Sequence, residues 1–287
     1  MSKTDLVIEE PESLPEVPPA HEEIGSSRRE WVWELWHFRE LLYFLAWRDV
    51  KVRYKQAAFG AAWAIIQPLF TMLIFTFFFG RMASIPTSGI PYPLFFYATL
   101  VPWTYFAGTL GQAGNSLVSN ASLITKIYFP RILLPASSVL SGLLDFAVGS
   151  SFLIAMMAYY RVRPTWTLLL WPIAVLDMLL VTLGISMLLG ALNVRYRDIK
   201  HVIPFTIQLG LWVSPVLYPA SFLTPRWRPI LVLNPLSAVM ELFRFSLFPD
   251  RQIDLNLMAT SFGVTLLFFF LGALYFRKAE QTFADVI

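Results

Sequence analysis

The sequence predicts an all-α integral membrane protein with six transmembrane helices, an N-terminal amphipathic interface helix and a re-entrant outer-face helical hairpin before the last span. Three observations support this fold class. Of the 287 residues, 56% are hydrophobic and 14% are charged, whereas soluble domains carry about 25% charged residues. Long uncharged segments recur along the chain, and Lys and Arg gather on alternate loops. This composition excludes an ordinary soluble enzyme.

The N-terminal part divides into two regions. Residues 1–27 are acidic and rich in proline, so we expect a disordered tail there. In residues 28–57 an apolar stripe at helical spacing lies among basic residues and tryptophans; the stripe comprises Trp31, Leu35, Phe38, Leu42 and Leu45. This pattern is typical of a helix in the plane of the membrane interface. The alternative is a helix that docks on another protein domain.

A membrane domain is predicted for residues 58–276, followed by a cytoplasmic tail at 277–287. A span needs about 20 apolar residues, and six segments qualify: 56–80, 94–118, 134–159, 167–192, 202–223 and 255–276. Prolines 86, 91 and 93 mark a loop between the first two. Residues 224–254 alternate apolar stretches with four prolines, which is too interrupted for a span and too apolar for a surface loop. A re-entrant hairpin, covered by protein, accounts for both properties.

The distribution of basic residues predicts the orientation. With both termini in the cytoplasm, 15 of the 22 Lys and Arg residues fall on the cytoplasmic side and 7 on the outer side. Cytoplasmic loops carry such an excess in membrane proteins. The net charge of +3 therefore reflects the flanks of the spans, and no nucleic-acid partner is expected.

Several kinds of catalytic site are missing from the sequence. The chain has no cysteine and three widely spaced histidines, which disfavours a metal centre. It has no G-x-x-x-x-G-K-[ST] phosphate loop, so we expect no ATP hydrolysis on this chain. A polytopic lipid-modifying membrane enzyme would have to rely on His201 or Glu241, and neither has an obvious companion in the sequence.

Two acids, Asp145 and Asp177, lie inside predicted spans. An ionisable group at that depth is costly, so a function such as proton coupling is the first hypothesis. Their depths are similar enough for them to approach each other if the two helices touch. The alternative is that each acid is hydrogen-bonded at a helix interface or faces water.

Aromatic side chains make up 16% of the residues and form stripes in the first and fifth predicted spans. Such faces can stack on the C–H faces of sugar rings and let them slide, which makes them candidate channel residues. They are Phe59, Trp63, Phe70, Phe77, Phe205, Trp212 and Tyr218. The alternatives are ordinary packing, contact with lipid, and the aromatic belts of membrane interfaces.

Two short charged cytoplasmic loops, 119–134 and 193–202, are too small to be domains and have the size of segments that dock on one. The candidate residues of the first loop are Asn120, Lys126, Phe129, Pro130 and Arg131. Those of the second are Arg195, Arg197 and Asp198.

An ordered set of motifs over residues 40–277 resembles the ABC-2 type permeases that export polysaccharides. It begins with Trp47–Gln56, Gly60, Trp63, Gln67-Pro68 and Gly80, and continues through Asn120, Lys126 and Phe129-Pro130-Arg131. It ends with Asn193–Ile199, Ser214-Pro215-Val216, Tyr218-Pro219 and Leu233–Leu236. No single motif is decisive, and residues 1–27 lie outside the pattern.

The resemblance implies a homodimer in the bacterial plasma (inner) membrane that pairs with two copies of a separate ATPase subunit, which binds ATP and Mg. It implies a lipid-linked glycan such as O-antigen, capsular polysaccharide or teichoic acid as cargo, with membrane lipids around the protein. The loop at 119–131 resembles the family's coupling helix, 28–57 its interface helix, and 224–254 its outer gate helices. An exporter of a drug or small lipid with the same fold is the alternative.

Overall fold

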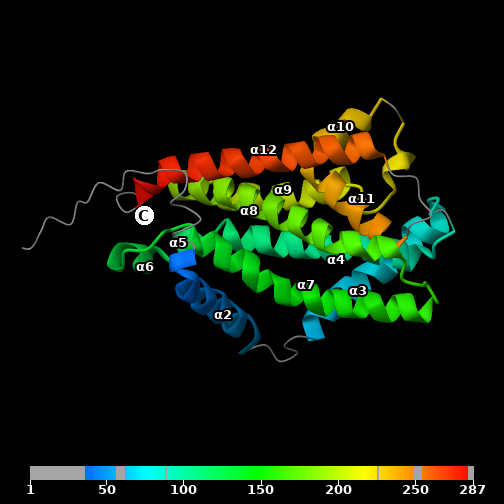
Figure 1. Ribbon diagram of the computed structural model, residues 1–287, viewed down its shortest axis with the longest axis horizontal. Helices are drawn as coiled ribbons and strands as arrows, with labels where there is room; N and C mark the ends of the chain where they lie inside the picture. Colours follow the sequence, from blue (N-terminus) through cyan, green and yellow to red (C-terminus); the bar gives the residue numbers. More distant parts are fainter. Residues whose placement is uncertain (1–35, 56–61, 88, 225, 249–253, 284–287) are drawn as a thin grey trace, which may run out of the picture.

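The computed structural model describes residues 36–55, 62–87, 89–224, 226–248 and 254–283. In these ranges the chain is helical, without strands, and the long helices run side by side along one axis (Figure 1). The first part comprises α2 (Arg39–Lys55), α3 (Trp63–Phe75), η2 (Thr76–Met82), α4 (Tyr92–Ala113), α5 (Ser116–Ser119), α6 (Ala121–Lys126) and α7 (Leu133–Tyr159). The second comprises η3 (Trp166–Leu170), α8 (Trp171–Arg195), α9 (Ile199–Val213), η4 (Ala220–Phe222), α10 (Arg228–Leu233), α11 (Pro235–Leu247) and α12 (Leu255–Glu280).

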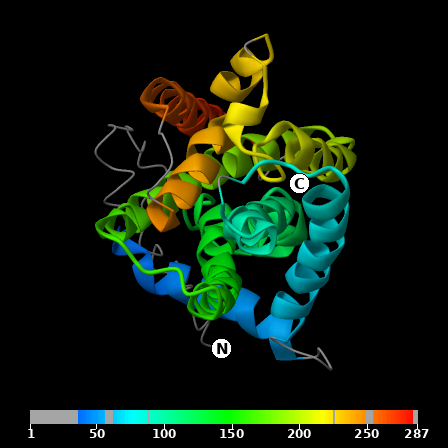
Figure 2. The same ribbon diagram turned by 90° about the vertical axis from the view of Figure 1, so that its right-hand side faces the viewer.

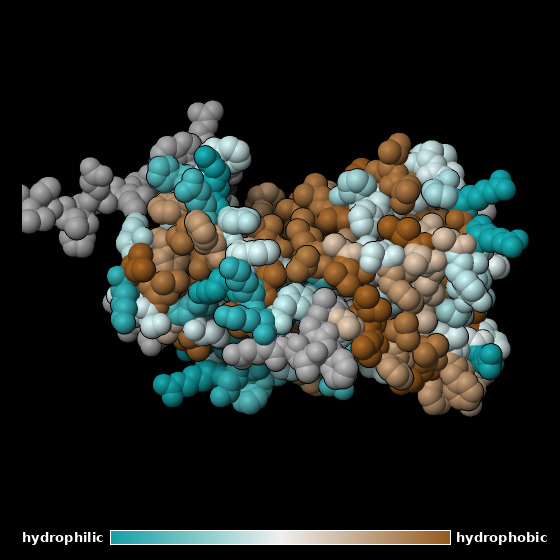
Figure 3. Space-filling model, turned by 90° about the horizontal axis from the view of Figure 1, so that it is seen from below, coloured by the Kyte–Doolittle hydropathy of each residue, from teal (hydrophilic) through white to brown (hydrophobic). Residues whose placement is uncertain are grey.

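The two ends of the molecule carry different elements (Figure 1). We call the end with α2, α5, α6 and the last turns of α12 the loop end, and the end with α10 and α11 the hairpin end. In Figure 3 an apolar belt lies between hydrophilic groups at the two ends, as expected for a protein that crosses a bilayer. The all-helical membrane architecture predicted from the sequence is therefore confirmed.

Four helical stretches in the described part are long and apolar enough to cross a membrane: Ile65–Met82, Leu133–Tyr159, Trp166–Arg195 and Leu255–Glu280. They match predicted spans one, three, four and six, although residues 56–61 of span one lie outside the described part. The count of six spans stays a prediction, because α4 and α9, at the other two positions, do not meet the same criterion.

Helix α4 occupies the centre of the bundle, surrounded by the other long helices (Figure 2). Its first half is buried almost without interruption, from Tyr92 to Trp103. A helix buried all round belongs to the core of a bundle. The buried residues Tyr97, Thr99, Tyr105 and Thr109 lower its hydropathy and face protein in this position, so their polarity costs less than it would against lipid.

Helix α9 ends well before the predicted end of span five at residue 223. It has 15 residues, which cover about 22 Å, less than the ~30 Å hydrocarbon core. It stops at Ser214, whose backbone is extended, because the residue before a proline avoids the helical conformation. The segment Ser214–Leu217 is buried, and its backbone groups are bonded by protein as described below.

The closest helix pair is α8 with α12, and glycines account for it. A Cβ added at Gly272 would lie 2.1 Å from the carbonyl oxygen of Gly184. A Cβ at Gly184 would lie 2.6 Å from the Cα of Phe269. The two backbones therefore touch, an arrangement that small residues permit in membrane helices.

At the loop end, α2 packs on α7 through part of its predicted stripe. Leu45 is buried, and Phe38 and Leu42 pack with it against the apolar cluster that also contains Phe276. The stripe residues Trp31 and Leu35 lie outside the described residues, as does the predicted disordered tail. That α2 lies in the membrane interface stays a prediction.

Candidate functional site

The first candidate loop is anchored at one side and exposed at the other. Phe129 is 4% exposed and packs in the cluster with Phe276 and Phe283. The backbone N–H of Arg131 donates to Oε1 of Glu280 at 2.7 Å, and its guanidinium donates to the carbonyl of Glu280 at 3.1 Å. The loop that follows α6 is thereby attached to the end of α12.

The exposed side of this loop is formed by consecutive residues. Lys126 is exposed, Ile127 is 56% exposed and Tyr128 is 75% exposed. Asn120 shapes the turn before them, because its side-chain amide donates to the carbonyl of Ser116 at 2.8 Å and its own carbonyl starts α6. The sequence reasoning missed Ile127 and Tyr128, although an apolar pair beside a lysine in a short loop is a recognisable signal for a binding surface.

The second candidate loop lies at the same end. Asn193 donates to the Gly114 carbonyl and to Oδ1 of Asn115, each at 3.0 Å, and so joins the end of α8 to the turn between α4 and α5. The guanidinium of Arg195 lies 5.5 Å from the ring centroid of Tyr196. Arg197 and Asp198 are exposed, and the Asp198 carbonyl accepts the first backbone bonds of α9. Both loops therefore lie at the loop end, and we call their exposed residues together the loop-end surface.

The predicted channel aromatics are on the outside of the chain. Trp63, Phe70 and Phe77 on α3 and η2, and Phe205 and Trp212 on α9, are each 52–60% exposed; Phe59 lies outside the described residues. Tyr218 is half-buried, and its hydroxyl donates to the Trp212 carbonyl at 3.1 Å. The ring of Phe75, which does not belong to the predicted stripe of the first span, lies 6.5 Å from that of Trp212, so α3 and α9 approach each other at this point. Helices α3 and α9 both flank α4 (Figure 2).

A groove runs between α3 and α4 and has a volume of about 600 Å³. Its walls include Trp63 from α3 and Trp103 from α4, and Arg53, Tyr54 and Asp145 also line it. We call it the α3–α4 groove.

Asp145 is not isolated in the membrane domain. The guanidinium of Arg53 forms an ion pair with it and also donates to Oε1 of Gln112, and the Tyr54 hydroxyl donates to its other carboxylate oxygen. Burial, followed by the hydrogen bond to Asp145, raises the pKa of Tyr54 to about 12, so this hydroxyl stays protonated at neutral pH. No local pattern indicated a partner for Asp145, because Arg53 lies 92 residues away along the chain.

Asp177 has different surroundings. It is 2% exposed, and Thr265 on α12 is its polar neighbour. Within the described residues its Oδ1 has no hydrogen-bond partner. The partners of the two acids thus come from different helices, and the predicted approach of Asp145 to Asp177 is not among the contacts of either group.

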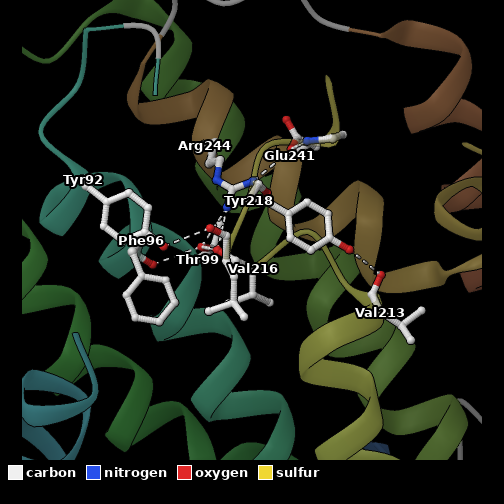
Figure 4. Close-up of polar contacts among 10 residues, drawn as sticks. Tyr92, Phe96, Thr99, Val213, Val216, Tyr218, Glu241 and Arg244 are labelled. Atoms are coloured by element: carbon white, nitrogen blue, oxygen red, sulfur yellow. Dashed lines mark hydrogen bonds and ion pairs between the residues drawn. The ribbon is translucent and has the colours of Figure 1, made fainter. Parts of the chain in front are cut away.

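The most connected charged side chain at the hairpin end is Arg244, which the sequence reasoning treated only as an outer basic residue. It is fully buried, and its guanidinium lies 4.1 Å from the ring centroid of Phe95. It donates to the carbonyls of Tyr218 at 3.0 Å and Val216 at 2.7 Å, and to Oγ1 of Thr99 at 3.3 Å (Figure 4).

Glu241 completes this arrangement, which we call the Arg244 cluster. Its Oε1 lies 3.0 Å from Nη1 of Arg244 and accepts the backbone N–H of Ala220 at 3.1 Å. Glu241 thus pairs with an arginine and not with the second acid or histidine that a membrane enzyme would use, and the i,i+3 spacing on one helix is a sequence signal for this ion pair. The cluster satisfies the buried backbone after α9 and ties it to α11 and α4.

The described residues contain no group of three or more His, Cys, Asp or Glu side chains that could hold a metal ion. The described residues instead form a continuous series of helix contacts from the loop end to the hairpin end. The loop-end surface is joined to α12, α12 is in backbone contact with α8, and both contact α11, which carries the Arg244 cluster.

Comparison with known proteins agrees with this picture. Residues 40–248 match the ABC-2 type transporter family. The O-antigen export system permease protein RfbA of Myxococcus xanthus is 29% identical over 257 residues, covering 88% of this chain and 98% of that protein. A protein of the same name from Klebsiella pneumoniae is 28% identical over 257 residues, covering 89% of this chain and 98% of the relative.

A more distant relative is the polysialic acid transport protein KpsM of Escherichia coli, 22% identical over 249 residues, with 82% of this chain and 91% of that protein covered. The prediction of a transport subunit rather than an enzyme is confirmed by these relatives. The family match extends over most of the chain, from α2 to the end of α11. The chain belongs to the ABC-2 type transporter family.

Proposed function

We propose that this chain is the channel-forming permease subunit of an ATP-driven exporter that moves lipid-linked polysaccharide such as O-antigen from the cytoplasmic to the outer side of the bacterial inner membrane. The observation that carries this proposal is the alignment with permeases named for O-antigen export over 98% of their length. The apolar belt and the four long apolar helices are consistent with it.

The loop end faces the cytoplasm in this proposal, with both termini on that side. The loop-end surface docks on a separate ATPase subunit, which supplies the ATP and Mg site. Ile127 and Tyr128 provide an exposed apolar tip beside Lys126, which is the composition of the centre of a protein interface with a charged rim.

Nucleotide-driven movement reaches the outer side through packed helices. Displacing the loop moves α12, because Glu280 holds both the backbone and the side chain of Arg131. Helix α12 moves with α8, because their backbones touch at Gly272 and Gly184. Both helices contact α11, so the hairpin end follows the loop end.

Two copies of the chain form the passage. The exposed aromatics of α3 and α9 lie on two helices that both flank α4. A passage between two copies would use them to contact a neutral, hydrated polymer through many weak interactions.

The test is deletion of the gene in its own host. We expect surface polysaccharide to disappear while lipid-linked polysaccharide accumulates in the cytoplasm, and plasmid-borne wild type to restore export. Purification of the tagged wild-type chain should recover an ATPase subunit in equal amount. Normal surface polysaccharide with a new sensitivity to drugs would overturn the proposal in favour of small-molecule export.

A further inference from the structure

The α3–α4 groove has a composition that the export function alone does not explain. Its volume of about 600 Å³ lies within the 300–1,000 Å³ range of small-ligand sites. It combines aromatic walls with a polar end formed by α2 and α7, where Arg53 meets Asp145.

The aromatic part of the groove comes from neighbouring helices. Trp63 of α3 is 56% exposed, so its ring is accessible to a ligand, whereas Trp103 of α4 is 5% exposed and is held in the core. Flat aromatic rings are large apolar contact surfaces of low conformational entropy, and they bind the apolar faces of ring-shaped ligands.

The polar part of the groove is rich in hydrogen-bond acceptors. The hydroxyls of Thr71 and Thr104 both donate to backbone carbonyls within their own helices, at 2.9 Å each. Their oxygen lone pairs are therefore left for a donor from a ligand. Each carboxylate oxygen of Asp145 accepts one bond, from Arg53 or from Tyr54, and retains further acceptor capacity.

The charged and polar residues that line the groove discriminate among three classes of ligand: a phosphate group, a lipid tail and a neutral sugar ring. Arg53 and Asp145 are the charged residues that line it, and they neutralise each other. A phosphate or pyrophosphate group needs an unpaired cation or accessible N–H donors; Arg53 is paired with Asp145, and its Nε, which has no hydrogen-bond partner among the described residues, is buried. A lipid tail gains nothing from threonine, glutamine and carboxylate groups. A neutral polyhydroxylated ring supplies hydroxyl donors for these acceptors and an apolar face for the tryptophans.

We propose that the α3–α4 groove is a binding subsite for a neutral sugar residue of the transported glycan, with Trp63 as the stacking surface and Thr71, Thr104 and Asp145 as acceptors of its hydroxyl groups. This inference rests on the proposed polysaccharide export. It adds a site within one copy of the chain to a passage between two copies.

The test uses the full-length chain with its ATPase partner in lipid nanodiscs. The probe is the repeat-unit oligosaccharide released by mild acid from the surface polysaccharide of the producing strain, and binding is measured by titration calorimetry. We expect Trp63→Leu to weaken binding about tenfold, because a stacking surface is lost. Trp63→Phe should recover part of the affinity, and Thr71→Val should weaken binding about threefold through loss of one acceptor at unchanged shape.

The matched control is Trp166→Leu, since Trp166 is 70% exposed at the start of η3 and does not line the groove; it should bind as the wild type does. Equal affinity in the wild type, Trp63→Leu and Thr71→Val would overturn the subsite. Competition by inorganic pyrophosphate or by a fatty acid would overturn the choice of a neutral sugar. Such results alongside intact export by the wild type would leave the proposed function standing, whereas normal surface glycan in the deletion strain would remove both.

Discussion

Arg244 at the hairpin end and three basic residues of the loop-end surface have opposite surroundings. At the hairpin end Arg244 is fully buried, with two carbonyls, a hydroxyl and a carboxylate around it. At the loop end Lys126, Arg195 and Arg197 are exposed. A buried cation is retained only where several groups satisfy it, so the hairpin end is a closed unit. The three exposed basic side chains at the loop end are accessible to the surface of another protein.

The largest loss of stability is expected for a substitution that disrupts the Arg244 cluster. Arg244→Ala should lower the free energy of unfolding by about 3–5 kcal/mol, because it leaves the carbonyls of Val216 and Tyr218 and the carboxylate of Glu241 without their partner. Tryptophan fluorescence during denaturation in detergent would measure it. Arg228→Ala is the matched control, because Arg228 pairs with Asp254 with its side chain 57% exposed, and such pairs contribute at most about 1 kcal/mol. Equal losses in both variants would contradict the contrast between buried and exposed arginines.

A smaller effect is expected in the helix pair that both ends share. Gly272→Ala places a Cβ against the carbonyl of Gly184, and overpacking of this kind costs about 1–3 kcal/mol. Gly263→Ala on the same helix is the control, because a Cβ there meets nothing within 4 Å and should be tolerated. Thermal unfolding followed by size exclusion would compare the two, and a Gly272→Ala variant as stable as Gly263→Ala would argue against the close approach of α8 and α12.

The attachment of the loop is weaker still. Arg131→Ala removes one hydrogen bond to the Glu280 carbonyl and leaves the backbone bond to the Glu280 side chain in place. The expected loss is about 1 kcal/mol. Export of surface polysaccharide should fall more than stability does, since the same contact transmits movement from the loop to α12. A variant with full export and unchanged melting would show that the loop moves independently of α12.

The smallest effect on stability is expected at the exposed tip. Tyr128→Ala should change the free energy of unfolding by less than about 0.5 kcal/mol, because Tyr128 is 75% exposed. The same variant should lose the ATPase subunit during purification. Tyr159→Ala, at the far end of α7 and 81% exposed, should retain it. If both variants retained the subunit, the loop-end surface would not be where the ATPase binds.

Much of this architecture was predictable from local sequence. Leu133–Tyr159 is a long apolar run with a single charged residue, Asp145, and Leu255–Glu280 is uncharged before its last turns. Such runs have few alternatives to spanning helices. The re-entrant form of residues 224–254 and the docking role of the two charged loops stay predictions, although the structure has the short helices α10 and α11 in the proline-interrupted segment. The sequence analysis placed the end of the fifth span at residue 223, whereas α9 ends at Val213. The segment is apolar throughout, so its composition does not reveal the end of the helix before Pro215. The backbone carbonyl of Val216 beyond this end is hydrogen-bonded by Arg244 from another helix.

By itself the sequence determined that the protein is helical, that it crosses a membrane and where most long helices lie, because hydropathy and helix length depend on neighbours along the chain. Only the tertiary structure decided that α4 is central, that Arg53 pairs with Asp145, and that Arg244 holds the hairpin to α4. Arg53 and Asp145 are separated by 92 positions in the sequence, and Arg244 and its α4 partner Thr99 by 145 positions. Spacing rules relate residues within one helix, so they do not predict such pairs. The partners of a buried charge depend on how the helices pack.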